Sequence, residues 1–172
     1  DWPEFNRTKK EISTEGTEGV KLFYPSAFYP HKNHHLLNSL ELPKDTEVLV
    51  TVTEDLLPIN SNSITCLGNI TRDEVYEIYS EIDALLFLSS DESLGLPILE
   101  AVRCNLPVIC PYAEYSKNLY SENCFYFDLA DPYSLLTAIA SLKEKLSEGW
   151  WPNWDFYSVY RNNGSILIED II

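Results

Sequence analysis

The sequence predicts an α/β fold, a doubly wound and mainly parallel sheet of the Rossmann-like kind. Short apolar runs of strand length alternate along the chain with segments whose apolar residues recur at helical spacing. This alternation is typical of right-handed βαβ units, which build parallel sheets covered by helices. With 172 residues, 45% of them hydrophobic, the chain is long enough for one domain with a sizeable core.

The first half of the chain supplies three predicted strands and one short helix. Residues 1–18 are polar and lack periodicity, so we interpret them as a linker or a truncated lead-in. The strands are the apolar, β-branched runs at residues 20–24, 47–53 and 63–67. A turn-rich loop after the first strand carries Lys32, and leucines at helical spacing predict a helix over residues 34–42.

The second half continues the alternation. Thr71 and, three residues later, Glu74 form a capping box, which predicts a helix start at this point. Further strands are predicted at residues 84–88, 107–110 and 124–127. Pro97 is placed to open one helix, and residues 131–146 begin with Asp-Pro and form a long amphipathic helix.

We therefore expect a main domain over residues 19–149, followed by a tail over residues 150–172. Three tryptophans open the tail: Trp150, Trp151 and Trp154. Packing on this domain or docking towards another one is a better interpretation of them than a sugar-stacking platform.

One stretch, residues 89–103 (SSDESLGLPILEAVR), concentrates the polar chemistry. It follows a predicted buried strand directly, at the edge where open parallel sheets bind ligands. Ahead of its helix, three backbone N–H groups can point at an anion, helped by the helix dipole. These are the N–H groups of Leu94, Gly95 and Leu96. Glu92 and Glu100 flank this cradle, and their carboxylates are suited to accepting hydrogen bonds from sugar hydroxyls.

The charge balance excludes several kinds of partner. Twelve basic residues against 27 acidic ones give a net charge of −15, which repels nucleic acid and anionic membrane surfaces. Cys66, Cys104, Cys110 and Cys124 have no C-x-x-C spacing, so we predict buried free thiols in a reducing compartment. No apolar stretch reaches the roughly 18 residues that a membrane-spanning helix needs.

Three histidines near Lys32 raise the question of a metal site. No acidic or cysteine partner is spaced to complete one, and His34 and His35 are adjacent, so they point in different directions on a helix. Together with His31 they do not predict a metal centre, and no metal is expected.

Four blocks of the sequence resemble a known family. ESLGLPILEAVRCNLPVI is similar to the donor-site signature of the retaining glycosyltransferases of family 4, the "glycosyl transferases group 1" domain, where two glutamates enclose seven residues. The other blocks are FYPHKNHHLL, LGNITRDEVYEIYSEIDALLFLSS and YFDLADPYSLLTAI. Together they cover residues 20–146 in the family's order.

The resemblance implies one half of a GT-B architecture, the carboxyl-terminal domain that binds the nucleotide sugar, here residues 19–149. By resemblance, Glu100 holds the ribose hydroxyls, Glu92 holds the donor sugar, and Lys32 carries the charge of the diphosphate. Glu92 and Lys32 are thus the candidate catalytic residues. The candidate nucleotide-sugar-binding residues are Ser26, Lys32, Glu92, Leu94, Gly95, Leu96 and Glu100.

The implied activity is that of a hexosyltransferase in surface polysaccharide synthesis. The donor would be a UDP- or GDP-hexose, and the acceptor a saccharide or a lipid-linked saccharide. Turnover would retain the anomeric configuration without a metal or other cofactor. The acceptor site would lie in a missing amino-terminal domain, so this chain alone is expected to be inactive. The resemblance implies a cytoplasmic location, with contact to the inner membrane face only through that other domain.

The first loop departs from the family pattern. An arginine usually stands five residues before the lysine, where this sequence has Ala27, preceded by Ser26. Either Ser26 with the backbone compensates, or Arg103 or Arg72 reaches in, or diphosphate binds weakly. The glycine after the lysine is replaced by Asn33, which tolerates a left-handed backbone.

Two other functions fit parts of the pattern. A nucleotide-sugar epimerase or a sugar-phosphate synthase uses the same architecture, although the acid and base residues of an epimerase are not found in this half. A non-catalytic partner or regulatory module is the alternative from another class, and Ala27 favours it. The sequence leaves the base, the sugar, the acceptor and the linkage open.

Overall fold

A computed structural model describes residues 19–58, 61–92, 95–116, 119, 122–156 and 159 of the chain. The interpretation of residues 1–18 as a lead-in, and that of the end of the tail, lie outside this part. So does Leu94, one of the three expected anion-binding residues.

The core of the fold is a six-stranded sheet in the order β3-β2-β1-β4-β5-β6, and every neighbouring pair is parallel. Its strands are β1 (Val20–Tyr24), β2 (Thr46–Val50), β3 (Ile64–Cys66), β4 (Ala84–Leu86), β5 (Val108–Pro111) and β6 (Cys124–Phe127). The chain leaves β1 towards β2 in one direction and leaves β4 towards β5 in the other. This confirms the predicted doubly wound, Rossmann-like fold.

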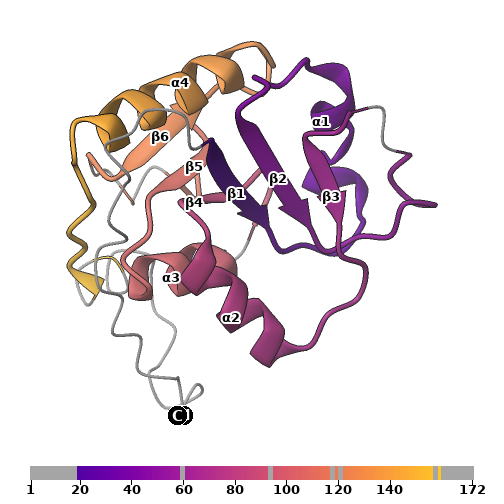
Figure 1. Cartoon of the computed structure of the whole chain (residues 1–172), viewed down its shortest axis with the longest axis horizontal. Helices are drawn as coiled ribbons and strands as arrows, with labels where there is room; N and C mark the ends of the chain where they lie inside the picture. Colours follow the sequence, from indigo (N-terminus) through magenta and orange to yellow (C-terminus); the bar gives the residue numbers. More distant parts are fainter. Residues whose placement is uncertain are drawn as a thin grey trace.

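Helices cover both faces of the sheet. They are η1 (Pro30–Lys32, a 3₁₀ turn), α1 (His35–Ser39), α2 (Arg72–Glu81), α3 (Leu96–Arg103) and α4 (Ser134–Ser147). Right-handed crossovers put α1 and α3 on opposite faces, because the chain winds away from β1 and from β4 in opposite directions. Figure 1 shows α2 beside α3, and α4 alongside β6 at the other end of the sheet.

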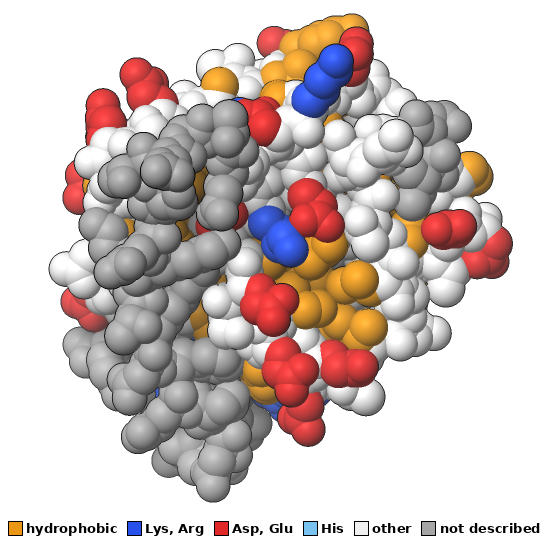
Figure 2. All heavy atoms as spheres, in the orientation of Figure 1, with side chains coloured by type: hydrophobic (Ala, Val, Ile, Leu, Met, Phe, Trp, Pro, Cys, Tyr) orange, Lys and Arg blue, Asp and Glu red, His pale blue; other side chains and the backbone are white. Residues whose placement is uncertain are grey.

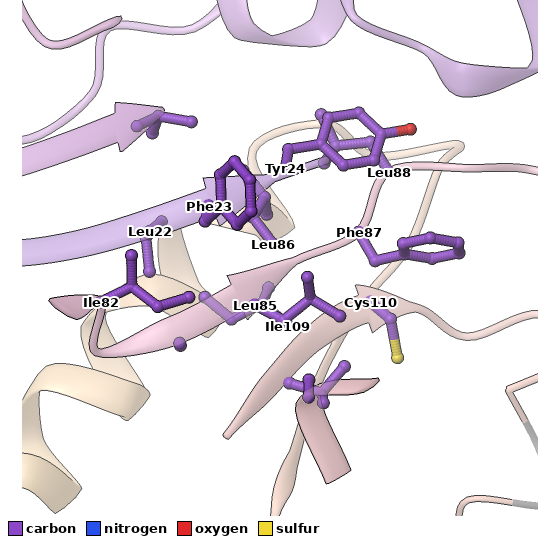
Figure 3. Close-up of a cluster of buried hydrophobic side chains, with 14 of the residues drawn as sticks. Leu22, Phe23, Tyr24, Ile82, Leu85, Leu86, Phe87, Leu88, Ile109 and Cys110 are labelled. Atoms are coloured by element: carbon purple, nitrogen blue, oxygen red, sulfur yellow. The ribbon is translucent and has the colours of Figure 1, made fainter. Parts of the chain in front are cut away.

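The middle of the sheet is buried on both faces. Leu22, Phe23 and Tyr24 of β1 have no exposed surface, and the same holds for all of residues 84–88. Figure 3 shows these side chains lying next to one another, with Ile109 and Cys110 of β5 on the adjacent strand. Such continuous apolar runs are what a parallel sheet covered on both faces requires, which explains why the sequence revealed them.

Helix α1 is shorter than the predicted helix over residues 34–42. Ser39 ends it, and the next residue, Leu40, has an extended backbone (φ −118°, ψ 140°). Leu40 and Leu42 are both 5% exposed while Glu41 between them is exposed, as in an extended chain that alternates its side chains. Leu36 and Leu37 thus lie in α1 as predicted, whereas Leu40 reaches the core from an extended segment after the helix.

Two other helix starts differ from their predictions. Helix α3 begins at Leu96, so Pro97 occupies its second position rather than its first. Helix α4 begins at Ser134 rather than at Asp131, because the preceding residues form a closed turn. In that turn the backbone N–H of Asp131 donates to the carbonyl of Asp128 at 3.0 Å.

The capping box is present as predicted. The backbone N–H of Glu74 donates to Thr71 Oγ1 at 3.3 Å, and the N–H of Thr71 donates to Glu74 Oε2 at 2.6 Å. These bonds satisfy two groups that the first turn of α2 cannot pair within the helix.

The described part of the tail packs on the domain. The indole N–H of Trp154 donates to the carbonyl of Leu106 at 2.7 Å, and the rings of Trp150 and Phe125 meet edge to face, 5.8 Å apart. The four cysteines carry free thiols, and three of them are buried.

The surface reflects the net charge. Figure 2 shows acidic side chains spread over one face of the molecule with few basic ones among them. Among the helices of the described ranges, none combines the length and the apolar character needed to cross a membrane.

Candidate functional site

The candidate site lies where β1 and β4 meet at the carboxyl edge of the sheet. These two strands are neighbours, and their connections leave to opposite sides, which opens a crevice between the two following loops. The loop after β1 carries Ser26 and Lys32. The loop after β4 carries Ser89 and Glu92 and leads into Gly95.

Lys32 and Glu92, sixty positions apart, form an ion pair in this crevice. Their side chains are 15% and 16% exposed, so the pair is largely withdrawn from water but still reachable. Ser89 Oγ donates to Glu92 Oε1 at 2.7 Å, and the Lys32 ammonium lies 5.8 Å from the centre of the Phe87 ring. The two candidate catalytic residues are thus brought together and held.

Two tyrosines fix the backbone under this ion pair. The Tyr24 hydroxyl donates to the carbonyl of Lys32 at 2.8 Å, and the Tyr115 hydroxyl donates to the carbonyl of Ser89 at 2.6 Å. Both phenols are largely buried, and burial raises the pKa of Tyr24 to about 12. They therefore remain neutral donors at any physiological pH.

Further hydrogen bonds join the two loops to each other. Asn33 Nδ2 donates to the carbonyl of Leu88 at 2.9 Å, and the backbone N–H of Ser90 donates to the carbonyl of His31 at 2.8 Å. Asn33 has a left-handed backbone (φ 53°), a conformation that asparagine tolerates better than most residues. These hydrogen bonds therefore hold the loop after β1 and the loop after β4 together.

Gly95 supports the expected anion cradle. It caps the amino end of α3 in the left-handed conformation (φ 59°), and a Cβ added there would lie 3.3 Å from Ile98 Cδ1. Pro97 has no N–H and the Ile98 N–H donates to the carbonyl of Gly95 at 2.8 Å, so the N–H groups of Gly95 and Leu96 are the candidate donors to an anion at this end of α3. Leu96 itself is 48% exposed.

Glu100 lies on α3, facing α2. The Tyr79 hydroxyl donates to Glu100 Oε2 at 3.0 Å. Burial raises the pKa of Glu100, while the Tyr79 hydrogen bond and the charge of Arg72 act in the opposite direction. One carboxylate oxygen is thus held by Tyr79, which leaves the group capable of accepting further hydrogen bonds.

The backbone of Ser26 is held by Thr51, the residue that follows the neighbouring strand β2. Its backbone N–H donates to Thr51 Oγ1 at 2.8 Å, and Thr51 Oγ1 donates back to its carbonyl at 3.2 Å. Its hydroxyl lies 3.2 Å from His34 Nε2. Ala27 beside it is exposed.

The arginines considered as substitutes for Ala27 have other contacts. The Arg103 guanidinium lies 5.6 Å from the centre of the Phe156 ring, in the tail. Arg72 Nε donates to the Tyr76 hydroxyl at 2.8 Å, and its charge acts on Glu100. Ser26 with its hydrogen-bonded surroundings is therefore the substitute that the geometry favours.

The three histidines lie in different surroundings. His31 is exposed and stacks on Tyr29, His34 is buried against Tyr24, and His35 is exposed on α1. Within the described ranges no group of three His, Cys, Asp or Glu side chains is placed to hold a metal ion.

Sequence reasoning missed several residues that build the site: Tyr24, His34, Tyr79, Ser89 and Tyr115. For Ser89 there was a signal, since it is the first polar residue after a buried strand. The tyrosines gave none, because their sequence surroundings read as ordinary core.

A family model described as "Glycosyl transferases group 1" matches residues 58–145. Among curated proteins, the chain is 25% identical over 130 residues to the O-antigen chain mannosyltransferase RfbU of Salmonella typhimurium, covering 69% of this chain and 37% of the relative. It is 34% identical over 73 residues to the serotype-specific mannosyltransferase WbdA of Escherichia coli, covering 42% of this chain and 9% of the relative.

Among solved structures, Anabaena Alr3699/HepE in complex with UDP and glucose matches 84% of this chain with a TM-score of 0.60 and 17% identity. The match covers 46% of that chain. At this identity the likeness supports the fold. The chain thus spans less than half the length of these proteins.

Proposed function

Because the chain belongs to the glycosyl transferases group 1 family, we propose that it is the donor-binding domain of a retaining, GT-B glycosyltransferase. In this proposal the enzyme transfers a hexose from a UDP- or GDP-sugar to a saccharide or lipid-linked acceptor during surface polysaccharide synthesis. The observation that carries the proposal is the Lys32–Glu92 ion pair at the switch point of the sheet, beside the glycine-capped helix α3.

The site offers separate partners for the diphosphate, the ribose and the donor sugar of a nucleotide sugar. Lys32 and the N–H groups of Gly95 and Leu96 would face the diphosphate, since a cation and a helix amino terminus both favour an anion. Glu100 would accept hydrogen bonds from the ribose hydroxyls. Glu92 would accept them from hydroxyls of the donor sugar. The spacing along α3 supports this order, because Glu100 lies more than one helical turn beyond Gly95.

A bound diphosphate would compete with Glu92 for Lys32, so the ammonium group would exchange one anionic partner for another. When the bond between the sugar and the diphosphate breaks, the electron pair stays on the diphosphate oxygen. Lys32 and the backbone N–H groups are placed to stabilise that developing charge. The proton of the acceptor hydroxyl would pass to the departing diphosphate, and no metal ion is part of the proposal.

The relatives' names support a narrower reading of the substrate. WbdA is described as a serotype-specific mannosyltransferase and RfbU as an O-antigen chain mannosyltransferase. We therefore propose mannose as the first hexose to test. By the family resemblance the acceptor site belongs to the amino-terminal domain, so the 172-residue chain is expected to bind donor without transferring sugar. A cytoplasmic location, at the inner membrane face where lipid-linked acceptors lie, goes with this proposal.

Calorimetric titration of the chain with UDP, GDP and ADP tests the donor-binding claim. We expect binding to at least one of them with a dissociation constant in the micromolar to millimolar range, roughly −4 to −8 kcal/mol. Lys32→Met should weaken binding of the diphosphate at least tenfold. The absence of heat with all three nucleotides at millimolar concentration would refute donor binding.

The alternative of a non-catalytic module rests on Ala27, where relatives carry a cation. Glu92→Ala and Glu100→Ala in the parent enzyme distinguish the two. A glycosyltransferase should lose a few kcal/mol of transition-state stabilisation, seen as a fall in kcat/KM of about a hundredfold or more. A regulatory module would leave the parent activity unchanged.

A further inference from the structure

Ser26 and His34 form a pair at the edge of the crevice that the proposed chemistry does not yet use. Ser26 follows the carboxyl end of β1, and His34 stands at the start of α1, eight residues later. The Ser26 oxygen and His34 Nε2 are 3.2 Å apart. His34 is 2% exposed, which is unusual for a histidine in a loop region and calls for a physical reason.

The surroundings of His34 keep its ring neutral. The ring packs against Tyr24 and Phe28, with centroid separations of 4.9 Å and 5.4 Å. Burial, together with the nearby positive charge of Lys32, lowers the pKa of His34 to about 4. A neutral imidazole carries one proton, on either Nδ1 or Nε2.

The hydrogen-bond partners decide which nitrogen carries that proton. Within the described part of the chain, the buried Nδ1 atom has no hydrogen-bond partner. A buried N–H without an acceptor is rarer and less tolerable than a bare acceptor, so the network assigns the proton to Nε2. His34 Nε2–H then donates to Ser26 Oγ, and the serine hydroxyl keeps its own proton for another acceptor.

The backbone groups of Ser26 already have hydrogen-bond partners. Thr51 holds its backbone N–H and its carbonyl. Within the described part of the chain, the Ser26 hydroxyl proton can reach the Tyr24 phenol oxygen or the adjacent carbonyl of Ala27, the latter at 3.2 Å and in an exposed position. A bond of that kind is readily exchanged for one to a stronger acceptor, since hydrogen bonds to charged groups are stronger than those to neutral ones.

Ser26 lies close to the Lys32–Glu92 ion pair. The Tyr24 hydroxyl interacts with the side chains of both Ser26 and Ser89, and Ser89 in turn donates to Glu92. The same Tyr24 hydroxyl donates to the carbonyl of Lys32. One phenol therefore links the serine to both partners of the ion pair.

We propose that Ser26 donates a hydrogen bond to the diphosphate of a bound nucleotide, and that His34 is the positioning residue that turns its hydroxyl proton towards the ligand. The inference rests on the proposed function and adds a second side-chain contact to the diphosphate, beside that of Lys32. A neutral serine, polarised from behind by an imidazole N–H, takes the place that a cation would have at Ala27. Lys32 remains the one full positive charge that the proposed site supplies.

The test measures dissociation constants of the full 172-residue chain for the tightest-binding member of UDP, GDP and ADP, and for the matching nucleoside without phosphates. Ser26→Ala should weaken nucleoside diphosphate binding about tenfold, because a hydrogen bond to a charged group is lost. Its affinity for the nucleoside should stay the same. A general loss of structure would weaken both ligands alike.

His34→Leu should weaken diphosphate binding at least threefold, again without changing the nucleoside affinity. His34→Gln places an amide nitrogen where Nε2 lies and should restore affinity to within twofold of the wild type. His34→Asn is too short to reach Ser26 and should not. His35→Leu, on the exposed neighbouring histidine, is the matched control and should bind like the wild type.

The double variant Ser26→Ala with His34→Leu tests directly whether His34 acts through Ser26. If His34 acts through Ser26, the double variant binds no more weakly than Ser26→Ala alone. A further loss in the double variant, or unchanged diphosphate binding in Ser26→Ala, would overturn this inference while leaving nucleotide binding itself established. If the wild-type chain binds no nucleoside diphosphate, both the inference and the proposed function fail. Should His34→Leu not fold, the Gln and Asn variants carry the same comparison.

Discussion

The Lys32 ammonium group pairs with the Glu92 carboxylate across the crevice between the loops that follow β1 and β4. The two charges balance each other, and the Ser89 hydroxyl donates a hydrogen bond to the carboxylate. A ligand diphosphate would compete with Glu92 for Lys32. This competition gives the two members of one ion pair opposite effects on binding.

Glu92→Gln should therefore raise the affinity for a nucleoside diphosphate severalfold, because Lys32 no longer has a competing anion and the ligand meets less negative charge. Lys32→Met should lower it at least tenfold. Titration of both variants measures the effect. Glu47→Gln breaks the exposed Lys21–Glu47 pair (3.3 Å) and serves as the control, with no change expected. Weaker diphosphate binding by Glu92→Gln would contradict the competition.

Nucleoside binding should fall as the pH drops through the raised pKa of Glu100. Burial raises that pKa, so protonation begins at a higher pH than for an exposed glutamate, and a protonated carboxyl group accepts hydrogen bonds poorly. Tyr79→Phe removes a hydrogen bond that lowers the pKa, so the loss of binding should move to higher pH. Saturation-transfer NMR with a nucleoside follows this without interference from phosphate titration.

Two further variants test whether Glu100 is the group that titrates in the pH experiment. Glu100→Gln should bind nucleoside more weakly and with a flat pH profile. Tyr133→Phe, at a tyrosine that is 70% exposed, should titrate like the wild type. A wild-type profile that stays flat from pH 7 to pH 4 would remove Glu100 from the ribose contact.

Gly95→Ala should impair both stability and diphosphate binding. The left-handed backbone (φ 59°) costs an alanine about 1–2 kcal/mol, and the new Cβ would press on Ile98 at the mouth of the anion cradle. Gly68→Ala is the matched control, since its φ is 70° and its added Cβ would make only an ordinary contact, 3.5 Å from Thr53 Cγ2. Chemical denaturation should show a similar loss in both, whereas titration should show weakened binding only in Gly95→Ala.

His34 should make the fold sensitive to mild acid. Its pKa is lowered to about 4 in the folded state, below the 6.5 of an unfolded histidine, so the unfolded chain takes up a proton first. The stabilisation is complete above pH 6.5 and is lost as the pH falls towards 4, by about 1–3 kcal/mol. Denaturation curves across this window should be less pH-dependent for His34→Leu than for His35→Leu. Parallel slopes for the two variants would assign the acid sensitivity to other groups.

The central strands of the sheet, such as β4 and β5, were predictable because they are buried on both faces and therefore read as continuous apolar runs. Residues 20–24 and 124–127 match β1 and β6 at both ends. Helix ends were less predictable. Leu36, Leu37 and Leu40 fit a helical face, but only tertiary packing decides that Leu40 enters the core from an extended segment.

The candidate site, too, was predictable from the sequence only in part. The family resemblance implied that Lys32 and Glu92 belong to one site, because it gave both a role at the donor sugar nucleotide. Their ion pair could not be predicted, nor could the bonds from Tyr79 to Glu100 and from His34 to Ser26. These depend on side-chain rotamers and on burial, which a linear pattern does not encode.

A crystal structure of the chain with its preferred nucleoside diphosphate would locate the ligand. We expect the diphosphate between Lys32 and the amino end of α3, with the Ser26 hydroxyl on a phosphate oxygen and both ribose hydroxyls on Glu100. A nucleotide bound away from the β1–β4 crevice, or bound there with Lys32 still paired to Glu92, would contradict this expectation.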